Sequence, residues 1–296
     1  MSVPAGVPAA VERLWPGRSA RLDVLGGGIT NHNVKVALDD GAAFVLRVAG
    51  KDTDLLGIDR RAEHEATRAA ASVGVGPEVI AFLEPEGWLV TRFVEGEIPP
   101  PGRLREPGQV ERVAATLRAV HGGPAVPATF DSFRVVEAYR ATAAARGVSV
   151  PADVDWAWET AAMIEAARGH VDVRPCHNDL LNANFIDDGT TLRIVDWEYA
   201  GMGDVVFDLA NFAVNHELDA HGRRALLAAY FDEVPAGLPE RLELMRFMSD
   251  FREAMWGVVQ TAISELDFDF AGYAREHFER MARTAAEPTF HAALQE

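Results

Sequence analysis

Cysteine, lysine and long apolar runs are scarce in this chain. Cys176 is the only cysteine, which excludes an intrachain disulfide and a zinc cluster built from cysteines. Lysine occurs only at Lys35 and Lys51, a bias that we attribute to genome composition. No apolar run approaches the ~20 residues that a membrane span needs, and no basic start precedes a long apolar stretch. We therefore expect a cytoplasmic protein that has no membrane partner.

Positive charge is also scarce, because 28 Lys and Arg residues face 45 Asp and Glu residues, a net charge of −17. Phosphate groups would be repelled, which argues against nucleic acid as a partner. The charge is compatible with a small cationic substrate, although many soluble proteins are acidic for solubility alone. With 296 residues, the chain is long enough for one large domain or for two lobes.

Two familiar phosphate-binding patterns are missing. The run Gly26-Gly27-Gly28-Ile29-Thr30-Asn31 fits neither the Gly-x-Gly-x-x-Gly pattern nor the Gly-x-x-x-x-Gly-Lys-Ser/Thr pattern. Dinucleotide-binding and P-loop folds therefore lose support. The run lies between two expected strands, 21–25 and 34–38, where a glycine-rich turn lets backbone N–H groups approach the phosphates of a nucleotide.

A cluster of polar residues between 174 and 208 carries the strongest chemical signal. His177, Asp179 and Asn184 follow the spacing His-x-Asp-x-x-x-x-Asn, and Asp196 follows a short apolar run. Phosphoryl transfer needs a carboxylate that accepts the acceptor's hydroxyl proton, together with oxygen ligands that hold Mg²⁺ against the phosphates. Asp179 fits the first role, and Asn184 and Asp196 fit the second.

The residues between these groups predict how they meet. The segments 184–186 and 192–195 read as two short strands, and the turn at 187–189 joins them. Such a hairpin would bring Asp196 back beside Asn184. A single Asp or Asn in this region could instead be a cap or a turn residue. The joint occurrence of all these groups at this spacing favours a catalytic site.

The motif resembles the catalytic and metal-binding loops of the choline/ethanolamine kinase and aminoglycoside phosphotransferase superfamily, which is related to the protein kinases. The resemblance implies that Asp179 is the catalytic base and that Asn184 and Asp196 bind Mg²⁺. It also implies that His177 and Asp208 support the catalytic loop, because a buried carboxylate can accept the loop's N–H groups. Asp208 could at the same time cap a helix over 209–215.

The same resemblance extends to a nucleotide site. Arg47, on an expected strand over 43–48, corresponds to the cation that grips the α- and β-phosphates of ATP, and Glu63 is our choice for its partner. Glu65 is the competitor, but it lies on another face of the expected helix over 58–73. The resemblance also assigns nucleotide contacts to the glycine-rich loop, in particular to Gly27, Gly28, Thr30 and Asn31.

The pattern of elements and the resemblance together predict an α+β, two-lobed, protein-kinase-like fold. Residues 1–95 would form a small antiparallel-sheet lobe that binds the nucleotide, with a helix over 7–15 and last strands over 78–82 and 87–93. Residues 96–296 would form a larger, mainly helical catalytic and acceptor-binding lobe. Its first helices are expected over residues 110–121, 135–146 and 157–169.

The acceptor side is expected to be lined by Glu198 and Tyr199, which directly follow the metal-binding Asp196. The C-terminal segment resembles the choline kinase segment in which aromatic residues surround a quaternary ammonium group. The residues assigned to this role are Trp256, Phe268 and Tyr273. Eukaryotic choline kinases carry two tryptophans three residues apart here, and Glu253 occupies the first position in this chain. Aromatic faces would bind a cationic acceptor through cation–π contacts.

These observations predict an ATP- and Mg²⁺-dependent kinase that phosphorylates the hydroxyl of a small amino alcohol such as choline or ethanolamine. An aminoglycoside or another hydroxylated metabolite such as thiamine is the enzymatic alternative. A catalytically silent, kinase-like binding protein is the alternative of another class, and the presence of Arg47, Asp179, Asn184 and Asp196 argues against it. The sequence leaves the acceptor, the choice between ATP and GTP, and the oligomeric state open.

Overall fold

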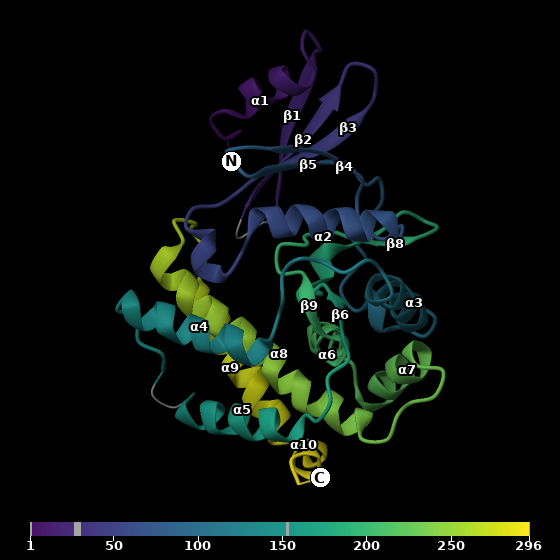
Figure 1. The fold of residues 1–296 in the computed structure, drawn as a ribbon, viewed down its shortest axis with the longest axis vertical. Helices are drawn as coiled ribbons and strands as arrows, with labels where there is room; N and C mark the ends of the chain where they lie inside the picture. The colour runs from purple at the N-terminus through teal and green to yellow at the C-terminus, as the bar shows by residue number, and fades with distance from the viewer. Residues whose placement is uncertain (1, 27–30, 152–153, 296) are drawn as a thin grey trace.

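The computed structural model describes residues 2–26, 31–151 and 154–295. A small lobe built on a β-sheet stands on a larger lobe of helices, and α2 (Arg60–Ser72) runs along the boundary between them (Figure 1). This arrangement confirms the expected two-lobed, kinase-like α+β fold. Among the helices of the described residues, none is both long enough and apolar enough to cross a membrane.

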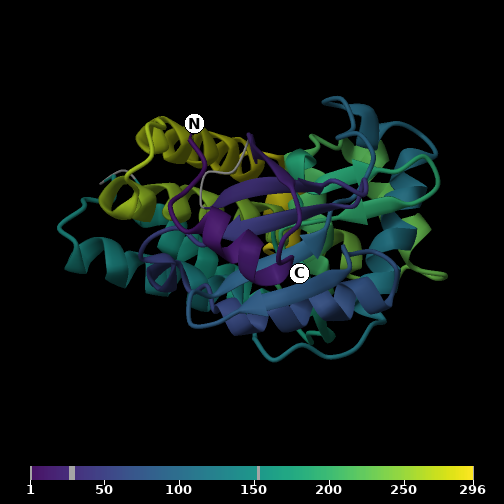
Figure 2. The same cartoon turned by 90° about the horizontal axis from the view of Figure 1, so that it is seen from above.

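The small lobe contains one five-stranded antiparallel sheet in the order β1-β2-β3-β5-β4. Val34, Val36 and Leu38 alternate with more exposed residues along one strand, so one face of the sheet is apolar and packs on α1 (Val7–Leu14). The view from above has α1 in front of this sheet (Figure 2). The strands are β1 (Ala20–Leu25), β2 (His32–Leu38), β3 (Ala43–Val48), β4 (Val79–Leu83) and β5 (Trp88–Arg92).

Helix α2 begins after Asp59, whose side chain accepts hydrogen bonds from the backbone N–H groups of Arg61 and Ala62. Its buried face includes Ala66, Ala70 and the charged residue Glu63. Glu63 is 3% exposed, and a carboxylate so deeply buried needs partners, which it finds on β3 and on its own helix, as described below.

A short hairpin joins the larger lobe to the segment that follows β5. It consists of β7 (Phe185–Asp187) and β8 (Leu192–Ile194). Glu97 and Asp187 exchange two backbone hydrogen bonds of 3.0 and 2.9 Å. Gly96 sits beside this contact with a φ of +154°, and a Cβ atom there would lie 2.6 Å from the carbonyl oxygen of Asp187. Only glycine fits this crossing without a shift of the backbone. We propose that the boundary between the two lobes lies near residue 95, next to this contact.

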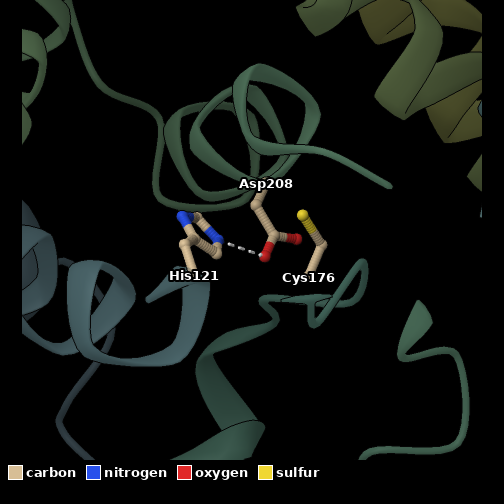
Figure 3. Close-up of side chains that lie close together, drawn as sticks. All are labelled: His121, Cys176 and Asp208. Atoms are coloured by element: carbon tan, nitrogen blue, oxygen red, sulfur yellow. Dashed lines mark hydrogen bonds and ion pairs between the residues drawn. The ribbon is translucent and has the colours of Figure 1, made fainter. Parts of the chain in front are cut away.

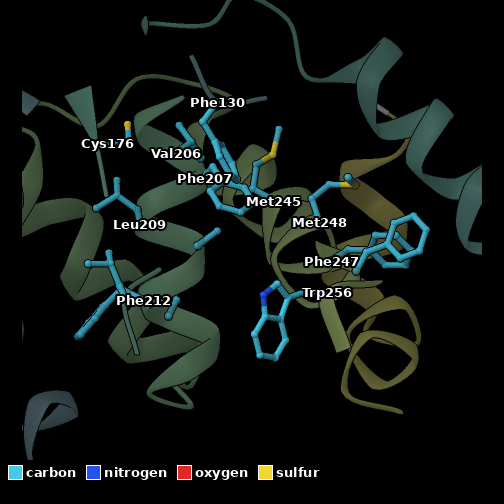
Figure 4. Packing of buried hydrophobic residues seen from close by; sticks show 14 of the residues in the cluster. Phe130, Cys176, Val206, Phe207, Leu209, Phe212, Met245, Phe247, Met248 and Trp256 are labelled. Atoms are coloured by element: carbon cyan, nitrogen blue, oxygen red, sulfur yellow. The ribbon is translucent and has the colours of Figure 1, made fainter. Parts of the chain in front are cut away.

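The larger lobe is organised around α8, a helix of 26 residues that is buried over most of its length and packs against α9, α6 and α4. Figure 4 shows apolar residues of α6 and α8, among them Phe207, Phe212 and Trp256, in one continuous core. The helices are α3 (Gln109–His121), α4 (Ser132–Ala145), α5 (Asp155–Ala167), α6 (Val205–Asn215), α7 (Ala220–Tyr230), α8 (Leu238–Ile263), α9 (Phe270–Ala285) and α10 (Pro288–Ala293).

The remaining elements are short. The two-stranded pair β6 (Val173–Cys176) and β9 (Gly201–Asp204) leads into and out of the polar cluster around residue 180. Three single 3₁₀ turns complete the described elements, namely η1 (Thr53–Leu56), η2 (Arg103–Arg105) and η4 (Asn182–Asn184). Asn184 was expected to begin a strand; it ends η4 instead, and the strand begins one residue later at Phe185.

Candidate active site

The loop that carries Asp179 runs from β6 to η4 and is held by Asp208 of α6. Asp208 Oδ2 accepts a hydrogen bond from the backbone N–H of His177 at 2.8 Å, and its Oδ1 accepts one from Asn178 at 2.6 Å. Burial alone would raise the pKa of the Asp208 carboxyl, but the hydrogen bonds from His121 and His177 lower it below its usual value. The carboxylate therefore stays charged and acts as an anchor for the loop.

Asp208 was also expected to cap its helix, and this expectation is wrong. Helix α6 begins at Val205, and Asp204 is the residue that caps it by accepting a hydrogen bond from Val206 at 2.9 Å. Asp208 lies in the first turn with its side chain fully buried under the loop. The helix starts four residues earlier than the apolar pattern indicated.

His121 and Cys176 lie beside Asp208 (Figure 3). His121 Nε2 is 3.0 Å from Asp208 Oδ2, and its Nδ1 is 2.7 Å from the Tyr230 hydroxyl. Burial raises the pKa of the Cys176 thiol well above its usual value, so the sulfur is protonated. Because the histidine and the carboxylate are already occupied by hydrogen bonds, the group supports the loop and does not offer a metal the ligands it needs.

Two further side chains fix the conformation of the loop. Asn211 Oδ1 accepts a hydrogen bond from the backbone N–H of Leu180 at 2.6 Å. His177 Nδ1 accepts one from the N–H of Asp179 at 3.2 Å, while its Nε2 lies 3.0 Å from the carbonyl oxygen of Val195. Burial lowers the pKa of His177, so the ring is neutral and donates through Nε2. The ring thereby joins the loop of Asp179 to the segment of Asp196.

The Asp179 carboxylate lies in a buried, predominantly acidic environment. Asn184 Nδ2 donates to the Asp179 carbonyl oxygen at 2.8 Å and lies 3.3 Å from its Oδ2, and Arg252 Nη1 is 3.5 Å from its Oδ1. Burial and the nearby Glu253 carboxylate raise the pKa of Asp179 well above its usual value, and Arg252 opposes them. A carboxylate whose pKa is raised is a better proton acceptor than an ordinary aspartate.

The β7–β8 hairpin returns the chain to Asn184, as expected. The backbone N–H of Val195 donates to the carbonyl oxygen of Asn184 at 2.9 Å, and Asp196 follows with a φ of +69°. Asp179, Asn184 and Asp196 all line one pocket. Because Asn184 uses its Nδ2 on Asp179, its side-chain oxygen is the atom left for a ligand. An amide oxygen and a carboxylate are donors that fit Mg²⁺.

Arg47 of β3 reaches both Asp196 and α2. Its Nη2 lies 2.7 Å from Asp196 Oδ1, and its Nη1 forms an ion pair with Glu63. Glu65 points elsewhere, because its side chain is 48% exposed and pairs with Arg68. The structure thus brings the expected pair together and leaves the competitor at the surface.

Asn31, the first described residue after the glycine run, belongs to a network that the sequence analysis missed. Its Nδ2 donates to Glu198 Oε2 at 2.8 Å, and its Oδ1 accepts from Arg60 Nη2 at 2.8 Å. Arg60 Nη1 also lies 2.7 Å from Glu63 Oε2 and 3.0 Å from Glu198 Oε2. Burial and the nearby Asp196 raise the pKa of Glu198 to about 7. Gly27, Gly28 and Thr30, assigned to the same loop, lie outside the described residues.

The side of the pocket that the sequence predicts to bind the acceptor is formed by α8, α9 and the segment after Asp196. The empty space of this pocket is about 580 Å³, a volume that includes the part open to solvent. Trp256 Nε1 donates to the Tyr199 hydroxyl at 2.8 Å, and the Trp256 and Tyr273 ring centroids are 5.4 Å apart. The polar and aromatic residues that line it are Asn31, Asn33, Asp179, Asn184, Asp196, Glu198, Tyr199, Arg252, Glu253, Trp256 and Tyr273.

Phe268 does not take the place expected for it. Within the part of the chain that the structure describes, it is not among the residues that line this pocket. Its side chain is 42% exposed, and its ring packs against Phe270 and Tyr273. Conversely, Arg252 lines the pocket but was not predicted. Its position directly before Glu253 was the only available signal for it.

Comparisons with known proteins show the family to which this chain belongs. The model of a family described as "Phosphotransferase enzyme family" matches residues 21–244. A solved choline/ethanolamine kinase family protein from Mesorhizobium loti shares 30% sequence identity, with 97% of each chain covered and a TM-score of 0.82. The chain therefore belongs to the phosphotransferase enzyme family and, within it, to the choline/ethanolamine kinase family.

Two further relatives are more distant in sequence. Protein LicA of Haemophilus influenzae is 26% identical over 263 residues, which cover 83% of this chain and 75% of the relative. Human ethanolamine kinase 2 is 24% identical over 302 residues, which cover 90% of this chain and 76% of the relative. The similarity to both extends across the two lobes.

Proposed function

We propose that the protein transfers the γ-phosphoryl group of ATP to the hydroxyl group of a small amino alcohol of the choline or ethanolamine type. The observation that carries the proposal is the meeting of Asp179, Asn184 and Asp196 in one pocket with Trp256 and Tyr273. The first three residues supply a base and metal ligands. The aromatic pair supplies faces for a cation.

In the proposed reaction, Asp179 accepts the proton of the acceptor hydroxyl as its oxygen attacks the γ-phosphorus. The bond from that phosphorus to the bridging oxygen of ADP breaks, and ADP leaves. Asn184 and Asp196 would hold Mg²⁺, which neutralises charge on the phosphates when it is bound. Since Asp208 and His177 fix the loop, Asp179 can meet the hydroxyl without reorganising.

The nucleotide is proposed to lie between the lobes. Arg47 would bind the phosphates from β3, while Glu63 holds the guanidinium in place. Gly27, Gly28, Thr30 and Asn31 are proposed to contact the same phosphates. Residues 1–95 then form the nucleotide lobe and residues 96–296 the acceptor lobe. A reaction that consumes ATP fits a cytoplasmic enzyme.

The charge of the pocket supports a cationic acceptor. Four carboxylates line the pocket, from Asp179, Asp196, Glu198 and Glu253. Among the described residues that line it, Arg252 is the one with a positive charge. Even with a bound Mg²⁺ and its phosphates, an ammonium group would find more negative than positive side chains around it. We assign acceptor contacts to Glu198, Tyr199, Trp256 and Tyr273, with Phe268 behind Tyr273.

The proposal is tested by measuring ADP release from ATP and Mg²⁺ with a panel of acceptors: choline, ethanolamine, thiamine and several aminoglycosides. Asp196→Ala serves as the blank because it removes a metal ligand. Release of ADP with one amino alcohol, absent in the blank, supports the proposal. Turnover with aminoglycosides alone would show that the acceptor is an aminoglycoside and not an amino alcohol. No turnover with any acceptor would refute the proposed reaction.

A further inference from the structure

One aromatic face of the acceptor pocket is already covered by a side chain of the protein. The Arg252 Cζ atom lies 4.1 Å from the centroid of the Tyr199 ring. A guanidinium at this distance makes a cation–π contact with the ring. This face is therefore occupied by an internal cation and is not free for the ammonium group of a substrate.

Arg252 is held firmly in that position. It is 1% exposed, its Nη1 forms an ion pair with Glu253, and the same atom lies 3.5 Å from Asp179 Oδ1. Moving the guanidinium away would leave two buried carboxylates without their cation, which is strongly unfavourable. A substrate must consequently fit beside Arg252.

The wall next to Arg252 includes two aromatic rings and a carboxylate. Trp256 and Tyr273 meet at an interplanar angle of 68°. The Tyr273 hydroxyl donates to Glu253 Oε2 at 2.9 Å. Each carboxylate oxygen can accept two hydrogen bonds, so Glu253 keeps capacity for a further donor. In an amino alcohol whose hydroxyl lies at Asp179, the donor left for Glu253 is an N–H of the amine.

We propose that Arg252 and Glu253 make this pocket selective for amino alcohols whose nitrogen carries N–H, such as ethanolamine and its monomethyl derivative, against the trimethylammonium group of choline. The inference rests on the proposed function and names the acceptor class of the same site. A quaternary ammonium has no donor for Glu253 and needs more room than an NH₃⁺ group. Sites built to bind a donor disfavour analogues that lack it, because the hydrogen bond to the buried, charged acceptor is not formed.

The test compares ethanolamine, N-methylethanolamine, N,N-dimethylethanolamine and choline as acceptors under identical ATP and Mg²⁺ concentrations. We expect kcat/KM to fall along this series, with choline roughly 10- to 100-fold below ethanolamine, as for a lost hydrogen bond to a charged group. Equal or better use of choline would overturn the inference while leaving the proposed kinase reaction intact. If none of the four compounds releases ADP above the Asp196→Ala blank, the proposed function fails and the inference falls with it.

Variants at Glu253 test whether that residue sets the order of preference among the four acceptors. Glu253→Gln keeps the shape but replaces one acceptor oxygen by an NH₂ group and removes the charge. The lost charge affects every cationic acceptor, whereas the lost hydrogen bond affects only those with N–H, so kcat/KM for ethanolamine should fall roughly tenfold more than kcat/KM for choline. Glu253→Asp keeps the charge and should preserve the order of preference. A uniform loss for all four acceptors in Glu253→Gln would show a structural role and contradict the proposal.

The matched control is Glu265→Gln, just beyond the end of α8. Its side chain is 75% exposed and pairs with Lys51 at 2.7 Å. This variant should leave all four kcat/KM values unchanged. Thermal unfolding of each variant, together with its KM for ATP, separates a loss of fold from a loss of acceptor recognition.

Discussion

Asp208 Oδ1 accepts a hydrogen bond of 2.6 Å from the backbone N–H of Asn178, whose φ of +67° is unusual for a residue other than glycine. The contact stabilises this conformation at the residue immediately before the proposed base. In Asp208→Asn, one oxygen becomes an NH₂ group that faces N–H donors. We expect kcat to fall about 100-fold, as for a misplaced catalytic group, and the free energy of unfolding to fall by about 3 kcal/mol.

Steady-state kinetics and urea unfolding measure the two effects. Asp219→Asn is the control, since Asp219 also accepts a backbone hydrogen bond, from Gly222 at the exposed start of α7. It should leave kcat unchanged. Wild-type kcat in Asp208→Asn would show that the loop does not depend on this carboxylate.

Glu63 and Glu65 offer a matched pair on one helix. Glu63→Gln removes the charge that holds both Arg47 and Arg60, so the KM for ATP should rise roughly tenfold, as for the loss of a charge-assisted hydrogen bond. Glu65→Gln removes only an exposed charge beside Arg68 and should leave the KM for ATP at its wild-type value. Equal effects of the two substitutions would mean that Arg47 does not need Glu63 to bind the nucleotide.

His216 makes stability depend on pH below neutrality. It is buried against Phe212, its Nε2 lies 3.2 Å from the Leu180 carbonyl oxygen, and burial lowers its pKa from 6.5 to about 4. The unfolded chain therefore binds a proton below pH 6.5 that the folded chain does not take up until about pH 4. Stability contributed by the neutral ring is present above pH 6.5 and is lost as the pH falls toward 4.

Comparison with His216→Phe isolates this contribution. Between pH 7 and pH 4, the free energy of unfolding of the wild type should fall by about 3 kcal/mol more than that of the variant. Urea unfolding at a series of pH values measures both. Parallel pH curves for the two proteins would show that His216 takes up its proton as readily in the folded state as in the unfolded state.

Gly96 is predicted to be essential for the link between the lobes. In Gly96→Ala, the new Cβ would press on the Asp187 carbonyl oxygen, and we expect a loss of about 3 kcal/mol in the free energy of unfolding. Gly41→Ala is the control, because Gly41 also has a positive φ, of +87°, but a Cβ there meets open space. It should cost about 1 kcal/mol. Equal losses in both variants would rule out the steric contact as the cause.

Much of the fold could be predicted from local sequence. The alternation of Val34, Val36 and Leu38 predicts a strand, and the spacing of apolar residues in Gln109–His121 predicts a helix. The start of α6 could not be read in the same way. Val205, Val206 and Phe207, the first three residues of α6, are all apolar, and residues 205–214 are all buried, so no alternation of apolar and polar residues marks where the helix begins.

The candidate site was predicted where chemistry and spacing coincide in one short segment, from His177 to Asp196. Arg60 and Arg252 were missed because their roles depend on contacts over 138 and 73 residues of sequence, with Glu198 and Asp179. Phe268 illustrates the opposite case. Its residue type suits a cation site, but the direction of a side chain in the connection between α8 and α9 is set by tertiary packing.

Asp179 is the residue on which the account depends most. Asp179→Asn keeps its size and removes the proton acceptor, and a single-turnover measurement with ethanolamine and labelled ATP follows formation of the phosphorylated product directly. We predict that the transfer rate falls by at least about 1,000-fold, while equilibrium binding of ATP stays within about threefold of the wild type. Product formation at the wild-type rate in Asp179→Asn would contradict the assignment of the base and the mechanism built on it.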